Sequence, residues 1–452
     1  MHFPRHPVKL PNLLATRPGR LLAFFFLYLT EGIPLGFTAV AIATQMRRQG
    51  LGPAEIGTFV GTLYLPWAFK WVMGPFVDVI SSDRFGRRRT WIVLTQAMMT
   101  VMLLVAMPVN FTTELKLFTF VIMGHNFFCA TQDVAIDALA CNVLSEQERG
   151  LANGLMFGGA YLGQAIGGAG VLFLIPYTGM PATYVFVAAV ILSVTLFVVL
   201  PMKEPRRAAR PEVAGSKLKA VGRELGQFAR DAYRAFTGSR AAWVGVIFAL
   251  LPIGAYGLSL ALQSNLAVEL GLTDNRIAQL NLASTVIAAL GCVAGGWLSD
   301  RLGRRRMLAL YVIGTAIPGF VLAWMMYRAG WIMPVDPQAS GRPVPPDHLV
   351  AAFWTAVLIF SAFQGLMYGT RTALFMDITT PAVAATQFTA YMALMNLVIS
   401  YTATWQGWTI ETWGYPVTLV IDGAAGMVCL ACLPFMVPRP NATNAGGENS
   451  ES

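Results

Sequence analysis

The sequence predicts an all-α integral membrane protein with twelve transmembrane helices in two six-helix bundles. Of the 452 residues, 56% are hydrophobic and only 12% are charged, about half the charged fraction of a soluble domain. Apolar runs of about 20 residues, long enough to cross a bilayer as helices, recur along the whole chain. A basic segment separates two halves that share one motif, DRxGRRR.

Each helix is expected where a long apolar run is bounded by charged or turn-forming residues. The first run is long enough to span and shows no cleavage pattern, so it is interpreted as a helix and not as a signal peptide. The expected spans are 21–45, 55–80, 89–108, 115–141, 149–175, 181–201, 241–268, 276–299, 306–327, 349–374, 385–410 and 415–437. They divide the chain into an N-terminal segment (1–20), a bundle (21–201), a linker (202–240), a second bundle (241–437) and a tail (438–452).

Positive charge predicts the orientation. With both termini inside, 24 Lys and Arg residues fall on the cytoplasmic side and six fall outside, as the positive-inside rule requires. This bias also accounts for the net charge of +9 without a nucleic-acid partner. Ten of the basic residues lie in 203–240, which either binds anionic lipid or is a plain solvated linker. We therefore expect a multi-pass membrane protein whose termini and linker are cytoplasmic.

Motifs for catalysis are missing from the sequence. It has no phosphate-binding P-loop, no nucleophile elbow and no histidine pair at metal-ligand spacing. We therefore predict that the protein is not an enzyme, has no cofactor or metal site, and is driven by an ion gradient rather than by ATP. Cys429 and Cys432, one turn apart in the last helix, are interpreted as packing residues. No disulfide is expected.

Two acids mark the helix expected at 115–141. Asp133 and Asp137 are four residues apart and therefore share one face. Acids inside a membrane helix are costly and by default face a cavity or a partner. Gln132 can donate and accept hydrogen bonds, as a sugar or peptide site requires. His125 is either a hydrogen-bonded packing residue or part of a proton relay.

Further charges lie inside other expected helices. Glu31, in YLTEGIPLGF, either faces the cavity or bonds a neighbouring helix. Lys70, in LPWAFKWVMGPFVD, lies too deep to reach the surface. It either serves substrate binding or coupling, or forms a structural ion pair with Asp133 or Glu31. Arg371 and Asp377, in and just beyond the tenth helix, form either a gate pair or a clamp for a phosphate or carboxylate.

The two halves repeat DRxGRRR at a spacing of 217 residues, from Asp83 to Asp300. The C-terminal copy reads GWLSDRLGRRR (296–306), and the N-terminal copy lies within GPFVDVISSDRFGRRR (74–89). A repeat joined by a basic linker indicates a two-bundle transporter whose site lies between the halves near mid-membrane.

In the C-terminal copy, Gly296 is expected to allow close helix approach, Asp300 to end a helix and Gly303 to make a tight turn. The pattern G-x-x-x-D-R-x-G-R-R-R is similar to the signature of the major facilitator superfamily, and the resemblance implies that fold and a cytoplasmic latch. The N-terminal copy departs from it because Asp78 lies five residues before Asp83, and either acid is a candidate. The predicted latch residues are Asp78, Asp83, Arg84, Gly86, Arg87, Gly296, Asp300, Arg301, Gly303, Arg304 and Asp377.

Longer stretches resemble one group in particular. EGIPLGF, LPWAFKWVMGPFVD, ATQDVAIDA and the following ERG, with ATQFTAYMAL in the C-terminal half, are similar to AmpG-type muropeptide permeases and the related acetyl-coenzyme A transporters. The resemblance implies a proton-coupled importer in the bacterial inner membrane for a bulky polar solute such as a muropeptide, with a pathway lined by Lys70, Gln132, Asp133 and Asp137. Expected partners are the lipid bilayer, a small-molecule solute and protons, and we expect a monomer. The alternatives are an importer of a siderophore or of an acetyl-coenzyme A-like anion, and a membrane sensor that no longer transports.

Overall fold

The computed structural model describes residues 12–80, 85–204, 217–237, 240–379 and 384–436. These residues form helices and turns, with no strand among them. They make the predicted twelve membrane crossings in two bundles of six. Seven helical runs in the described chain are long and apolar enough to span, and two of these runs contain a pair of crossings each.

The N-terminal half contains the first six crossings. Its elements are a 3-10 turn (Leu13–Ala15), α1 (Arg17–Gly36), a π-helical turn (Phe37–Ile42), α2 (Ala43–Arg48), α3 (Pro53–Leu63), α4 (Leu65–Ala68), a 3-10 turn (Lys70–Val72), α5 (Met73–Val79), α6 (Arg87–Ala106), α7 (Leu115–Val143), α8 (Glu146–Ala165), a π-helical turn (Ile166–Gly170), α9 (Val171–Val194) and a π-helical turn (Thr195–Val199). The chain reverses direction inside α9 at Gly179, where φ is 73°.

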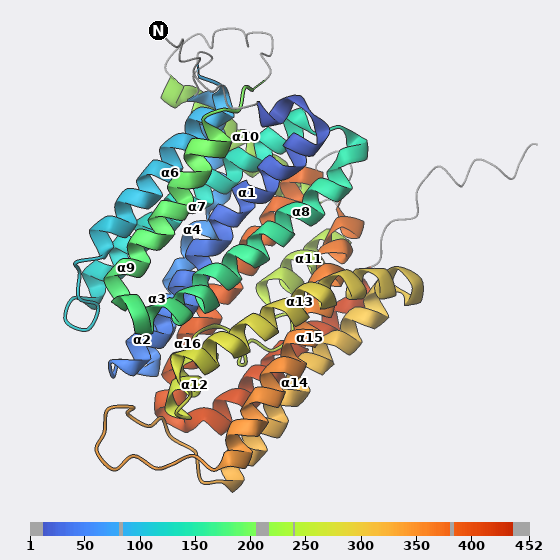
Figure 1. Ribbon diagram of the computed structural model, residues 1–452. Helices are drawn as coiled ribbons and strands as arrows, with labels where there is room; N and C mark the ends of the chain where they lie inside the picture. Colours follow the sequence, from blue (N-terminus) through green and yellow to red (C-terminus); the bar gives the residue numbers. More distant parts are fainter. Residues whose placement is uncertain (1–11, 81–84, 205–216, 238–239, 380–383, 437–452) are drawn as a thin grey trace, which may run out of the picture.

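The linker and the C-terminal half follow. Their elements are α10 (Lys217–Thr237), α11 (Arg240–Leu250), α12 (Leu260–Glu269), α13 (Asp274–Leu302), α14 (Arg304–Arg328), α15 (Asp347–Ile378), α16 (Ala384–Val428) and a 3-10 segment (Cys429–Phe435). α16 reverses direction at Gly414, where φ is 83°. Figure 1 shows α1, α8 and α9 in one half and α13, α14 and α15 in the other.

Two of the predicted helices are interrupted in the structure, so the prediction that each is continuous is wrong. The span predicted at 55–80 is broken into α3, α4, a 3-10 turn and α5. Pro66 contributes to this break because it has no N–H to donate. The span predicted at 241–268 is interrupted between α11 and α12 by the non-helical residues 251–259. Irregular backbone at membrane depth is tolerated where it is buried in protein or lines a cavity.

Glycines let α1 and α8 pack in close contact. A Cβ atom on Gly32 would lie 2.0 Å from the carbonyl oxygen of Ala160, and one on Gly163 would lie 2.5 Å from that of Leu29. Because neither position has room for a side chain, the two backbones approach as closely as small-residue packing in membranes allows.

The two halves are joined by ion pairs at one end of the molecule. Arg47, at the end of α2, pairs with Glu269 of α12 at 2.6 Å, and both side chains are buried. Arg48 pairs with Asp274 of α13 at 2.5 Å. The positive-inside rule predicts that this end faces outward, and it is called the outer end on that prediction. The two ion pairs hold the halves together there in this conformation.

Ion pairs at the opposite end join residues within one half. Arg20 pairs with Glu148 at 2.5 Å in the N-terminal half, and Arg304 pairs with Asp377 at 2.5 Å in the C-terminal half. Among the described residues, the ion pairs that join the two halves therefore lie at the end predicted to face outward.

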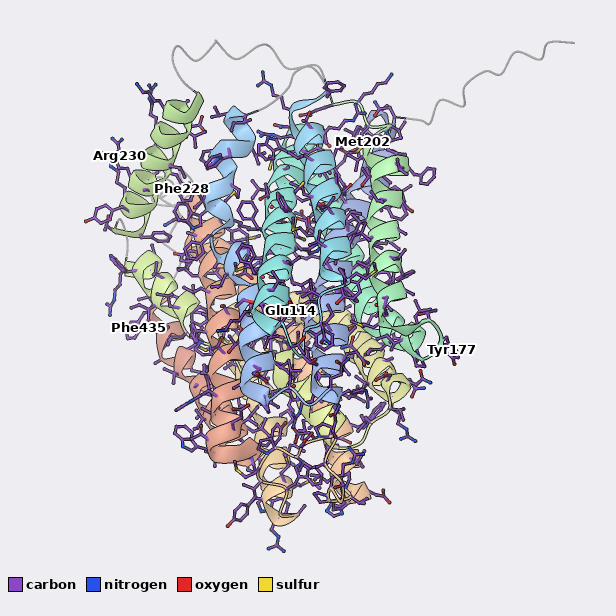
Figure 2. The ribbon with its side chains drawn as sticks, turned by 90° about the vertical axis from the view of Figure 1, so that its left-hand side faces the viewer. Glu114, Tyr177, Met202, Phe228, Arg230 and Phe435 are labelled. Carbon is purple, nitrogen blue, oxygen red and sulfur yellow. The ribbon has the colours of Figure 1, made fainter. Side chains whose placement is uncertain are left out.

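The linker contains a helix that contacts both halves. In α10, the ring of Phe228 stacks on Trp71 of the second crossing with ring centroids 5.5 Å apart. Phe236 meets the edge of Tyr391 in α16 at 5.4 Å. Figure 2 shows Phe228 directed toward the helices, whereas Arg230 points away from them. The linker therefore includes an amphipathic helix. The sequence analysis, which gave a lipid-binding or a solvated linker as alternatives, did not predict this helix.

Candidate functional site

Three crossings of the N-terminal half bring charged side chains together inside the bundle. Lys70 Nζ lies 2.6 Å from Asp133 Oδ2, which is the pairing anticipated as one alternative for Lys70. Lys70 stands on the 3-10 turn of the broken second crossing, and Asp133 stands on α7. The break in the second crossing therefore helps to set the position from which Lys70 reaches the acid.

Two more carboxyl groups complete this cluster. Asp137, one turn along α7, accepts a hydrogen bond of 2.6 Å from the Tyr28 hydroxyl of α1. Glu31, one turn along α1, is buried, and its Oε1 has no partner. Its carboxyl lies close enough to Asp133 to share a hydrogen bond when one of the two is protonated. The cluster thus holds three carboxyls and one ammonium group.

Gln132 and His125 have other surroundings. Gln132 is fully buried and donates to the Thr30 hydroxyl at 2.9 Å. Gln96 donates to the same hydroxyl at 3.3 Å, so these residues form a polar network inside the N-terminal bundle. His125 is fully buried, and its Nδ1 lies 2.9 Å from the Met99 carbonyl oxygen. This contact agrees with the alternative that His125 is a hydrogen-bonded packing residue. Gln132 is not exposed to a solute in this conformation.

The C-terminal half has its own polar centre at the interruption between α11 and α12. Asp422 accepts hydrogen bonds from the backbone N–H groups of Tyr256 at 2.9 Å and Gly257 at 2.7 Å. Gln406 donates to its other carboxylate oxygen at 2.7 Å. Asp422 therefore satisfies backbone groups which the interruption leaves without helical partners.

Arg371 lies near this interruption. It is buried, and its guanidinium lies 4.6 Å from the ring centre of Tyr368, one turn earlier in α15. The proposed pairing of Arg371 with Asp377 is not what the structure shows, because Asp377 is bound by Arg304. Arg304 also pairs with Asp300 at 2.8 Å.

The repeated motif has matching backbone geometry in both halves. Gly86 and Gly303 have φ of 94° and 96° and stand directly before α6 and α14, so the tight turn predicted at Gly303 is confirmed and occurs twice. Asp300 does not end its helix, because α13 continues to Leu302. The side chain of Asp78 and residues 81–84, which include Asp83 and Arg84, lie outside the described part of the chain.

Three other latch residues have clear positions. Arg301 stacks over Trp297 at 4.0 Å. A Cβ atom on Gly296 would meet nothing within 4 Å, so the close helix approach predicted at Gly296 is wrong. The close approach occurs at Gly295, where an added Cβ would lie 2.2 Å from the Leu366 carbonyl oxygen. Arg87, the first residue of α6, belongs to the same turn as Gly86.

A family model described as the Major Facilitator Superfamily matches residues 21–403. The chain belongs to this superfamily. Members of the superfamily are membrane transporters rather than enzymes, which agrees with the absence of catalytic motifs in the sequence.

Two relatives are similar in sequence. "Putative transporter AmpG 4" from Rickettsia felis is 25% identical over 317 residues, covering 68% of this chain and 74% of the relative. The "Anhydromuropeptide permease" of Escherichia coli K12 is 24% identical over 410 residues, covering 89% and 77%. Among solved structures, a D-xylose-proton symporter matches with a TM-score of 0.69 at 13% identity, covering 92% of this chain and 97% of that one. This last likeness shows the fold alone.

Proposed function

We propose that this superfamily member is a proton-coupled importer of a cell-wall muropeptide, working in the inner membrane with both termini in the cytoplasm. The observation that carries the proposal is the cluster of Glu31, Asp133, Asp137 and Lys70. The name of one relative, the anhydromuropeptide permease of Escherichia coli, supports the muropeptide class. The positive-inside bias supports the orientation.

The charges of the cluster favour proton binding. One ammonium group can compensate only one of the three carboxylates, of which Glu31 and Asp133 are buried and Asp137 is partly buried. A buried charge without a partner is strongly destabilising. Lys70 compensates Asp133 at 2.6 Å. The other two carboxyls, Glu31 and Asp137, are neutralised at least cost by taking up protons. Uptake at one membrane face and release at the other would couple the proton gradient to the exchange between outer-open and inner-open states.

Accumulation in proteoliposomes tests this proposal. The probe is radiolabelled N-acetylglucosaminyl-anhydro-N-acetylmuramyl tripeptide, with an imposed gradient that is acidic on the side of the outer end. The parent should accumulate the probe above its external concentration. Asp133→Asn and Asp137→Asn should lose this accumulation, because each removes a proton-binding or charge-compensating carboxyl, yet keep exchange of probe between the two sides.

Glu114→Gln is the matched control, since Glu114 is an exposed acid at the start of α7 outside the cluster. Its accumulation should equal that of the parent, with membrane protein levels measured for every variant. If both aspartate variants accumulate the probe as the parent does, coupling through this cluster is wrong. If the parent transports no probe at all, the substrate class is wrong.

A further inference from the structure

We infer that Arg371 forms a binding subsite for a carboxylate group of the transported solute. The subsite lies in the C-terminal half beside the interruption between α11 and α12. The inference rests on the proposed function, because it assigns one part of the muropeptide to one part of the chain. It is independent of the proton-binding cluster, which lies in the N-terminal half.

The first argument is that Arg371 is a buried cation without an anion. Its exposed fraction is 5%, and its Nε has no hydrogen-bond partner. Among the described residues, no acid forms an ion pair with it, and the nearest candidate in its own helix, Asp377, is held by Arg304. A buried charge is costly unless it is paired, so retention of this guanidinium indicates a partner that arrives with the solute.

The second argument concerns Asp422, the acid bound to the interruption that also carries Tyr256. Asp422 accepts two backbone hydrogen bonds and one from Gln406. It therefore fixes the interruption of the seventh crossing instead of compensating Arg371. The same interruption carries Tyr256, whose hydroxyl lies next to the guanidinium. Broken helices in transporters commonly form the substrate site in this way.

The third argument is that residues from both halves converge on this point. Tyr161 of α8 lies within electrostatic range of Arg371, although the two residues belong to different halves. Tyr368 covers one face of the guanidinium, which leaves the N–H groups at its edge to donate to a planar carboxylate. Polar aromatic rings around a cation suit a solute that has sugar rings next to an acid group.

The test compares two probes that differ by a single charge. One is the disaccharide N-acetylglucosaminyl-anhydro-N-acetylmuramic acid, which has one free lactyl carboxylate, and the other is its methyl ester. Binding of each to the full chain in nanodiscs of neutral lipid is measured by isothermal titration calorimetry. Because hydrogen bonds to a charged group are worth about tenfold or more in affinity, the parent should bind the acid at least about tenfold more tightly than the ester.

Arg371→Gln should remove this preference by weakening the acid to the affinity of the ester, while the ester binds as it does to the parent. Arg371→Lys, which keeps the charge, should retain part of the preference. Equal binding of both probes by the parent would overturn the inference and leave the proposed function standing, as would an unchanged preference in Arg371→Gln. Failure of the parent to bind either probe would overturn this inference, and the proposed substrate class would fall with it only if the parent also failed to accumulate the tripeptide probe.

Discussion

Replacing Glu269 by Gln should open the outer end of the molecule. The Glu269 carboxylate accepts hydrogen bonds from Arg47 at 2.6 and 2.9 Å, from the Tyr415 hydroxyl at 2.5 Å and from the Val335 N–H at 2.8 Å. Arg47 belongs to the N-terminal half and the three other residues belong to the C-terminal half. Opening the outer end must therefore separate Arg47 from the carboxylate.

The magnitude follows from burial. Removing one partner of a buried ion pair costs about 3–5 kcal/mol, and the lower value applies here because Gln keeps one acceptor oxygen. About 3 kcal/mol changes an equilibrium roughly 100-fold. The variant should therefore move a chain that is closed at its outer end about 99% of the time to roughly equal open and closed populations.

Distances between spin labels can measure this shift. Labels at Tyr177 and Tyr327, which are 81% and 67% exposed, report on the outer turns of the two halves by double electron–electron resonance in a cysteine-free background. The long-distance population should rise in Glu269→Gln and stay unchanged in Glu114→Gln, an acid at the same end outside the inter-half pairs. A variant distribution identical to that of the parent would refute the view that this pair closes the outer end.

Three further outcomes are expected. Asp377→Asn should slow transport more than Asp300→Asn at equal protein levels, because Asp377 ties Arg304 to the distant helix α15 whereas Asp300 pairs with it across the adjoining Gly303 turn. Equal rates would contradict this. Gly303→Ala should lower the free energy of unfolding by about 1–2 kcal/mol because φ is 96° there. Gly296→Ala, with open space around the added Cβ, should not lower it. Thermal melting of both variants in detergent measures the difference, and equal melting temperatures would contradict the prediction. A cysteine introduced at Gln227, which is exposed on α10, should not react with an impermeant maleimide in intact cells but should react after permeabilisation. Labelling in intact cells would contradict the predicted cytoplasmic position of the linker.

The sequence was most informative where a charge interrupts an apolar run. Asp133, Asp137, Lys70 and Glu31 could be found in this way, because each is a costly residue at membrane depth, and the structure places all four in one cluster. Tyr28 could not be found, since a tyrosine in a membrane helix is unremarkable until its hydroxyl is seen 2.6 Å from Asp137. The contacts of Gln132 and His125 could likewise not be predicted from the sequence, because the rotation of a helix about its axis decides whether a residue faces a solute or its own bundle.

The helix interruptions explain why the C-terminal site was harder to predict than the N-terminal cluster. Residues 251–259 follow an apolar run and carry one proline, so hydropathy alone extends the helix through them. The interruption is stable because Asp422, more than 160 residues away, accepts the N–H groups of Tyr256 and Gly257. A long-range contact thus replaces local helical hydrogen bonds, and no pattern within a window of one helix contains it. Asp422 is committed to these backbone groups and to Gln406. It therefore does not compensate Arg371, whose guanidinium remains available for the proposed carboxylate subsite.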